Sequence, residues 1–167
     1  MSEQLLSGYS LRAGSGLDRA RLVKFIQRTY QEIFPKQDFS HLARTVEQYF
    51  SKDTPLWWVD FSTPEPRNIS STVTVACLWA GNAVDQVQGD RHTHIFLLYV
   101  IPEHRRRGIA KVLMQQVETW AASRGDHQIS LQVFQSNQPA LNLYQQLGYK
   151  IQSVSMIKSL HQQTEVE

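Results

Sequence analysis

The chain has 167 residues, 41% of them hydrophobic and 19% charged, which is typical of one globular domain with a buried core rather than a fibrous or disordered protein. Its formal net charge of +2 is too small to indicate binding to nucleic acid, and its single cysteine, Cys77, excludes an internal disulfide. The sequence shows no basic and apolar leader and no run of about 18 apolar residues, so we expect a cytoplasmic protein that does not enter the membrane.

The first half of the chain begins with a predicted strand at residues 9–12. Helical periodicity follows over residues 17–34 and again over residues 39–50. Asp18 and Ser40 stand where N-cap residues are expected. This part of the sequence therefore predicts one strand and two helices.

Two further strands are predicted at residues 56–61 and 72–79, both rich in aromatic and aliphatic side chains. The connection over residues 62–71 contains proline, serine and asparagine, which favour loops. It is longer than a tight hairpin needs.

The next predicted elements are a buried strand and an amphipathic helix. Residues 94–100 form the apolar run of the strand, and Pro102 ends it because proline supplies no backbone N–H to a sheet. The helix follows at once, with apolar residues on one face at helical spacing: Ile109, Val112, Leu113, Val117 and Trp120. Gly108 therefore stands where a strand becomes a helix.

The turn before this helix has the features of an anion-binding site. The unpaired N–H groups of a first helical turn and the positive end of the helix dipole attract a phosphate, and glycine lets the phosphate approach the backbone. Three consecutive arginines, Arg105, Arg106 and Arg107, add positive charge. The sequence has neither a Gly-x-Gly-x-x-Gly loop nor a P-loop, which excludes the common fingerprints for dinucleotides and nucleoside triphosphates.

A second strand and helix follow. Residues 129–134 alternate apolar and polar side chains, which predicts a half-buried strand. Ser136 or Asn137 can cap the helix after it. Pro139 suits the first turn of that helix, and Gly148 stands where a left-handed residue would end it.

Two motifs in this order resemble those of the general N-acetyltransferase (GNAT) superfamily. The pattern Arg-x-x-Gly-x-Ala at residues 105–110, after Val-x-Pro, is similar to the superfamily's pyrophosphate-binding signature. The pattern Asn-x-x-Ala-x-x-x-Tyr-x-x-x-Gly-Tyr at residues 137–149 matches the helix that follows the strand flanking the cofactor. The chain is therefore identified as a member of this superfamily, closely over residues 95–158 and loosely before them.

The resemblance implies an α/β fold, with a central mixed twisted sheet of about six to seven strands flanked by about four helices. Final strands are then expected after the helix that ends near Gly148. Residues 1–160 are expected to form a single N-acetyltransferase domain, and residues 161–167 a polar C-terminal tail.

The resemblance also implies transfer of an acetyl group from acetyl-CoA to a primary amine of a small molecule, peptide or protein, by direct attack in a ternary complex. No metal is expected, and a homodimer is left open. The residues expected to bind acetyl-CoA are Leu98, Tyr99, Val100, Arg105, Arg106, Arg107, Gly108, Ile109, Ala110, Asn137 and Tyr144. The first three would act through their backbone, where their strand parts from its neighbour.

Acetyl transfer needs a proton donor for the departing thiolate and a proton acceptor for the amine. Tyr144 matches the superfamily's tyrosine and is the candidate general acid; its alternative role is packing on the buried side of its helix. His94 stands eleven residues before Arg105, where some members carry a glutamate, and is the candidate base. Two alternatives remain. His94 is only a polar residue at the start of its strand, or the proton passes through a water relay to a more distant carboxylate such as Asp60 or Glu32.

The acceptor pocket is expected, by resemblance, between the first two helices and the strand at residues 57–61, and the connection over residues 62–71 either contacts the acceptor or is a plain hairpin connection. Several aromatic side chains either hold an amine there by cation–π contact or belong to the core: Trp57, Trp58, Tyr30, Phe34 and Trp79.

Two other function classes stay open. The missing glutamate at position 94 leaves room for a catalytically inactive acyl-CoA-binding sensor or interaction module. A nucleic-acid-binding domain that uses residues 104–107 as a phosphate clamp is disfavoured by the small net charge.

Overall fold

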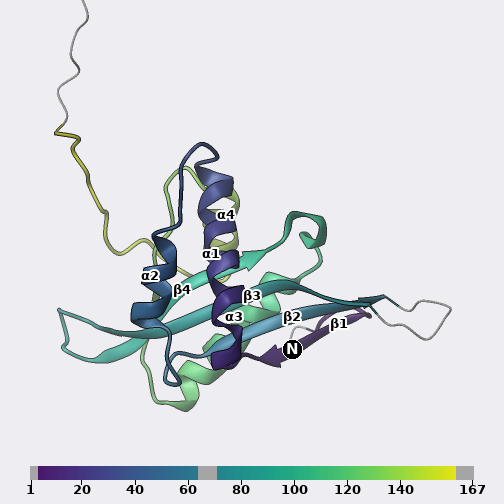
Figure 1. The fold of residues 1–167 in the computed structure, drawn as a ribbon. Coiled ribbons are helices and arrows are strands. Elements are labelled where there is room, and N and C mark those ends of the chain that lie inside the picture. Colours follow the sequence, from purple (N-terminus) through teal and green to yellow (C-terminus); the bar gives the residue numbers. More distant parts are fainter. Residues whose placement is uncertain (1–3, 64–70, 161–167) are drawn as a thin grey trace, which may run out of the picture. The chain divides into compact units, whose positions relative to one another are not determined.

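The computed structural model describes residues 4–63 and 71–160 of the chain (Figure 1). The chain divides into two compact units, one up to Gln132 and one from Val133 onward. Among the residues that the structure describes, no helix combines the length and the apolar character needed to cross a membrane.

The first unit is built on a mixed sheet whose strand order is the order of the sequence. Its strands, as far as the structure describes the chain, are β1 (Tyr9–Ala13), β2 (Leu56–Thr63), β3 (Ser71–Val84), β4 (Arg91–Val100) and β5 (Ile129–Leu131). From β1 to β4, each strand is antiparallel to the next, and β5 is parallel to β4. A parallel neighbour requires a crossover, which the helix between β4 and β5 supplies.

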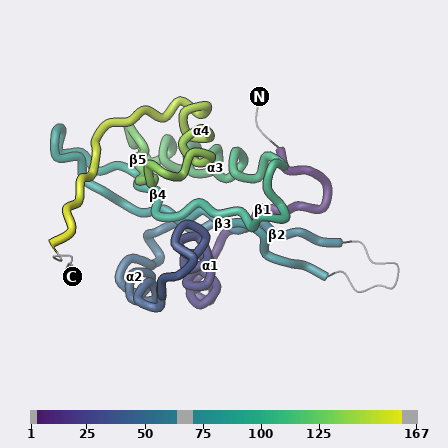
Figure 2. The backbone as a smooth tube through the Cα atoms, turned by 90° about the horizontal axis from the view of Figure 1, so that it is seen from above, coloured from purple at the N-terminus to yellow at the C-terminus, as the bar shows by residue number. Residues whose placement is uncertain are grey.

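Three helices cover this sheet: α1 (Arg19–Ile33), α2 (Leu42–Tyr49) and α3 (Ile109–Ser123). Figure 2 shows α1 and α2 on one side of the sheet and α3 on the other. Each was predicted from helical spacing of apolar residues, and their existence is confirmed.

The two predicted caps turn out differently. Asp18 is the N-cap residue of α1, but its carboxylate accepts from the Ser15 N–H (2.9 Å) and closes a capping box on the short 3₁₀ turn before the helix. The prediction that Ser40 caps α2 is wrong: its hydroxyl donates to Asp38 (2.7 Å), and α2 begins only after His41. The chain first turns, with the Leu42 N–H bonded to the Phe39 carbonyl (3.0 Å).

The tryptophans of β2 and β3 form the core. Trp58 is fully buried against Phe25 of α1, and Trp57 packs edge-on against Trp120 of α3. The two neighbours face opposite sides of the sheet, as residues next to each other in a strand must. Trp79 is also fully buried, so these three side chains are core residues and do not line an acceptor pocket.

The sheet has fewer strands than the six to seven expected. β5 ends at Leu131, although residues 129–134 predicted a strand, and residues 150–160 lie in neither helix nor strand. All eleven of these last described residues are exposed. The connection at residues 64–70 and the tail at 161–167 lie outside the described residues.

The second unit contains α4 (Gln138–Gln146). Asn137 caps it, with the side-chain oxygen accepting from the Ala140 N–H at 3.4 Å. Gly148 has a φ of 91°, and the Tyr149 N–H bonds back to the Tyr144 carbonyl (2.9 Å), which is a Schellman ending. The predicted cap and the predicted left-handed glycine are both confirmed.

Candidate active site

The site begins where β4 and β5 part. Their parallel pairing covers only three residue pairs and ends with Ile95 opposite Leu131, whereas β4 continues to Val100. On its other side β4 stays paired with β3 to its end, with Phe96 as an extra residue that makes a bulge. Backbone groups on the β5 side of β4 after Ile95 therefore have no β5 partner and, apart from the Val100 carbonyl, which accepts from Arg105, are available to hydrogen-bond a ligand. This parting includes residues 98–100, where the resemblance implied it.

The anion-binding turn lies directly after β4. Gly108 is the N-cap of α3 and has a φ of 77°, and a Cβ added there would meet nothing within 4 Å. The first intrahelical bond runs from the Val112 N–H to the Gly108 carbonyl (3.2 Å), so the preceding N–H groups of α3 point out of the helix end. Arg106 also has a left-handed backbone, with a φ of 65°. Space, free N–H groups and positive charge thus coincide at one turn.

The three arginines of the turn have different partners. Arg105 donates twice to the Glu32 carboxylate (2.7 and 2.9 Å) and once to the Val100 carbonyl (2.8 Å). Arg107 donates to the Tyr9 hydroxyl at 2.6 Å. Arg106 is exposed and shows no such bond within the described part of the chain. The first and third arginines therefore tether the turn to α1 and β1, and contacts of all three with a pyrophosphate stay a prediction.

Glu32 and Asp60, the two carboxylates predicted as alternative ends of a water relay, both accept hydrogen bonds from the protein. Glu32 receives the Tyr99 hydroxyl as well as Arg105, and burial together with this carboxylate raises the pKa of Tyr99. Asp60 accepts from Arg12 Nε (2.6 Å) and from the Thr74 hydroxyl (2.7 Å). Each carboxylate oxygen of Glu32 and Asp60 therefore accepts at least one hydrogen bond within the protein.

His94 lies one pair before the strands part. Its Nδ1 is 2.7 Å from the Ser130 hydroxyl of β5, and its ring meets Phe96 edge-on at 5.4 Å. Partial burial, and then the neighbouring His92, lower the pKa of His94. The imidazole is therefore neutral at neutral pH and able to accept a proton.

Tyr144 lies on α4 of the second unit. Its ring meets that of Tyr149 edge-on at 6.0 Å, and burial raises the pKa of Tyr144 to about 12. The phenol stays protonated throughout the neutral and mildly alkaline range, as a proton donor must.

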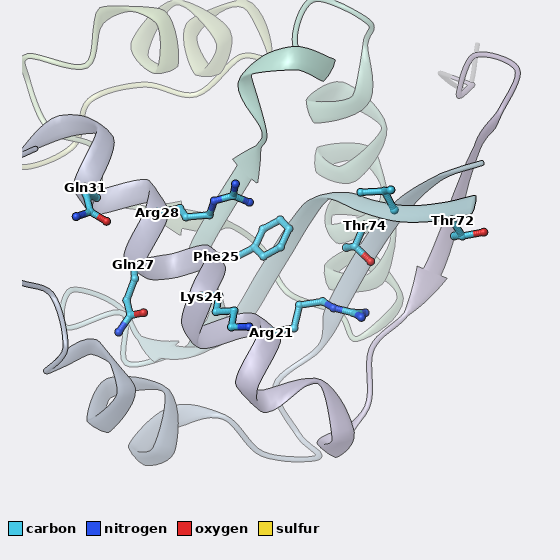
Figure 3. A pocket seen from close by; sticks show the side chains of 9 residues that line it. Arg21, Lys24, Phe25, Gln27, Arg28, Gln31, Thr72 and Thr74 are labelled. Carbon is cyan, nitrogen blue, oxygen red and sulfur yellow. The ribbon is translucent and has the colours of Figure 1, made fainter. Parts of the chain in front are cut away.

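A groove of about 560 Å³ runs along α1 beside β3 (Figure 3). Arg21, Lys24 and Arg28 line it together with glutamines and threonines, and none of its lining residues within 4–63 and 71–160 carries a carboxylate. Arg21 is 3.6 Å from Asp18, whereas Lys24 and Arg28 have no acidic partner among the described residues. Phe25, in the wall of the groove, packs edge-on against Tyr99, which places the groove on the α1 side of the sheet.

Sequence reasoning missed several of these residues. The basic side chains of α1 are spaced three and four apart and could have been recognised as one helix face. Ser130 and His92 gave no such signal, because their meeting with His94 depends on the register between β4 and β5.

A strand that parts from its neighbour beside an arginine-rich, glycine-led helix start is the arrangement that the two sequence motifs implied. The model of the acetyltransferase (GNAT) family matches residues 21–149, and the chain belongs to this family.

Two curated relatives are similar over part of their length. Peptidyl-lysine N-acetyltransferase YiaC of Escherichia coli is 46% identical over 32% of this chain, and N-acetyltransferase 8 of Homo sapiens is 30% identical over 45% of it. The matched segments span 34% and 39% of those proteins. Among solved structures, AAC(6′)-Iy in complex with the bisubstrate analogue CoA-S-monomethyl-acetylneamine has a TM-score of 0.65 and 15% identity, covering 93% of this chain and 99% of its own.

Proposed function

We propose that residues 1–160 form one N-acetyltransferase domain that moves an acetyl group from acetyl-CoA to a primary amine by direct attack in a ternary complex. The observation that carries the proposal is the parting of β4 from β5 immediately before the Gly108 turn. The family match spans both compact units, which supports treating them as one functional domain.

The residues of the site fit acetyl-CoA. The open space at Gly108 and the free N–H groups of α3 suit a pyrophosphate, and the unpaired backbone of β4 suits the amides of a pantetheine arm. When bound, acetyl-CoA supplies the thioester whose acyl carbon the amine attacks. β4 backbone donors would hold the carbonyl oxygen as its negative charge develops.

In this proposal one side chain accepts a proton and another donates a hydrogen bond. His94 takes a proton from the amine, and Tyr144 donates a hydrogen bond to the sulfur as the C–S bond breaks. Freeing an alkylamine of pKa about 10.4 from its proton at pH ~7.4 costs about 4 kcal/mol, whereas an α-amine of pKa about 8 costs less than about 1 kcal/mol. Because the lowered pKa of His94 makes it a weak base, an α-amine is the favoured acceptor.

Initial-rate kinetics test the proposal. Free thiol is measured while acetyl-CoA and an amine are varied together, with α-amino peptides, lysine peptides and an aminoglycoside as acceptors. We expect thiol release with an α-amino peptide and intersecting double-reciprocal lines. Parallel lines would indicate a covalent acetyl-enzyme instead of a ternary complex. Binding of acetyl-CoA without thiol release from any acceptor would favour the sensor alternative.

The groove along α1 indicates the charge of the acceptor. In the part of the chain that the structure describes, three cations and no carboxylate line it, which favours an acceptor that carries carboxylates or phosphates over a polycation such as an aminoglycoside. We therefore propose an acidic peptide, or another amine with an acidic group, as the acceptor.

Exchanging Lys24 or Arg28 for glutamine should weaken binding of an acidic acceptor selectively. For a peptide with glutamates after its amino terminus we expect KM to rise about tenfold, equivalent to about 1.4 kcal/mol for one lost charged contact. For the same peptide with glutamines, KM should not change. Arg19→Gln is the matched control, because Arg19 is on the same helix but packs over Phe50 outside the groove. A lower KM for the glutamine peptide or for an aminoglycoside would contradict the proposed acceptor charge.

A further inference from the structure

Four polar side chains form a row beside the point where β4 and β5 part. The Ser130 hydroxyl lies between two imidazoles, 2.8 Å from His92 Nε2 and 2.7 Å from His94 Nδ1. The row continues to Gln128, whose side-chain amide is 3.4 Å from His92 Nδ1. The two histidines are two residues apart on one strand and therefore face the same side of the sheet.

Charged groups lie on the other side of β4 from this row. Thr93, between the two histidines, is fully buried and donates to Asp126. Asp126 in turn pairs with Arg124 at 2.7 Å. Arg91 follows the same alternation as Thr93 and lines a different groove with Arg124. The titratable group that faces His94 in the row is therefore His92.

A serine hydroxyl has one hydrogen and can accept two hydrogen bonds, so the row has three self-consistent arrangements. In the first, Gln128 donates its N–H to His92, His92 donates to Ser130, and Ser130 donates to His94 Nδ1. A neutral His94 then carries its hydrogen on Nε2 and has no nitrogen left to accept a proton. In the second, every bond is reversed: His94 Nδ1–H donates to Ser130, Ser130 to His92 Nε2, and His92 Nδ1–H to the Gln128 carbonyl. In the third, both imidazoles donate to the Ser130 oxygen, and His92 Nδ1 accepts from the Gln128 N–H.

The second and third arrangements are compatible with a protonated His94, and the first is not. An imidazolium carries hydrogens on both nitrogens, so its Nδ1–H must donate to Ser130, which then either donates to His92 Nε2 or accepts from it. The second arrangement also needs the Gln128 side chain turned by half a rotation, which exchanges its nitrogen for its oxygen and leaves the shape unchanged. In both arrangements a neutral His94 has a bare Nε2, which can take a proton without rearrangement of the row.

We propose that Ser130, His92 and Gln128 are positioning residues that hold His94 in its Nδ1–H form and leave Nε2 free to accept the proton of the amine. The inference rests on the proposed function for the role of His94 as base. In this row the Ser130 hydroxyl has the role that a carboxylate has in a catalytic triad, where it accepts from the histidine Nδ1–H and orients the ring.

The tautomer can be measured without any substrate. In ¹⁵N-labelled protein, the ring ¹⁵N shifts of His94 above its pKa should show a protonated Nδ1 and a bare Nε2 in the wild type. Ser130→Ala should remove this preference, and Ser130→Thr, which keeps the hydroxyl, should restore it. A wild-type His94 with its hydrogen on Nε2 overturns the inference, whatever the enzyme assay shows.

Two variants should move the acidic limb of the kcat profile in opposite directions. Ser130→Ala removes the acceptor for the Nδ1–H of the imidazolium, which disfavours the charged form, so the pKa of His94 falls and the limb moves to lower pH. In the same variant kcat on the plateau should fall about tenfold. Gln128→Glu provides an acceptor-only, negatively charged group, so the limb should move to higher pH.

The outcomes separate this inference from the proposed function. If Ser130→Ala turns over with the same His94 tautomer, plateau kcat and acidic limb as the wild type, the inference is overturned. The acetyltransferase proposal would still stand. Absence of thiol release with every amine would overturn the proposed function, and the role of the row in catalysis with it.

Discussion

Replacing Gly108 with valine should abolish the rise in melting temperature that acetyl-CoA gives the wild-type protein. A ligand that binds only the native state stabilises it by RT ln(1 + [L]/Kd), about 2.7 kcal/mol at a hundredfold excess over Kd. At Gly108 the backbone has a φ of 77°, which a β-branched residue adopts only at a cost of about 1–3 kcal/mol. Valine either fills the open space that the phosphates need or turns the N–H groups of α3 away from it.

Gly125→Val is the matched control for this experiment. Gly125 follows the other end of the same helix, has a φ of 82°, and offers equally open space to a Cβ. Both variants should therefore lose similar stability without ligand, as a thermal scan would show. Only the Gly108 variant should lose the shift with millimolar acetyl-CoA. A full shift of the melting temperature in both variants would show that the phosphates of acetyl-CoA do not bind at this turn.

The elements that could be predicted are those with local signals. α3 was predicted from the spacing of its apolar residues, and its start from Pro102 and Gly108. The caps of α4 followed from Asn137 and Gly148 in the same way. In each case the residues that determine the structure lie within one or two turns of each other, so the sequence pattern contains the whole reason.

The contacts that could not be predicted join distant parts of the chain. Glu32 and Arg105 are 73 residues apart, and Ser130 meets His92 and His94 across 38 and 36 residues. Such pairs depend on strand register and helix placement, which no local pattern encodes. The final strands expected after Gly148 are absent from the described residues. Residues 150–160 contain strand-forming side chains, but a strand also needs a partner strand, and propensity alone does not supply one.

From the sequence, three adjacent arginines look like one cluster aimed at a phosphate. In the structure, Arg105 links the turn to α1, and Arg107 links it to β1 through Tyr9. If the turn binds the pyrophosphate as proposed, ordering it in this way before the ligand arrives would lower the entropy cost of binding, so the tethered arginines would favour binding even without touching the anion.

Tyr144→Phe should lower kcat by about a hundredfold while the KM for acetyl-CoA and the melting temperature stay nearly unchanged. With its pKa raised to about 12, the phenol lies about 3.5 units above a thiol of pKa about 8.5, so complete proton transfer would cost about 5 kcal/mol. We therefore expect Tyr144 to donate a hydrogen bond to the sulfur as negative charge develops, with solvent completing the transfer. Phenylalanine removes that donor and keeps the ring.

Tyr149→Phe is the control, because Tyr149 is the other ring of the edge-on pair and loses the same hydroxyl group. Its kcat should stay within about twofold to threefold of the wild type, whereas that of Tyr144→Phe falls. The phenol of Tyr144 deprotonates only near pH 12, so the kcat profile between about pH 7 and 10 should show no alkaline fall that Tyr144→Phe removes. A Tyr144→Phe enzyme that melts at a lower temperature but keeps its turnover would assign this tyrosine to packing, and the proton donor for the thiolate would then have to be solvent.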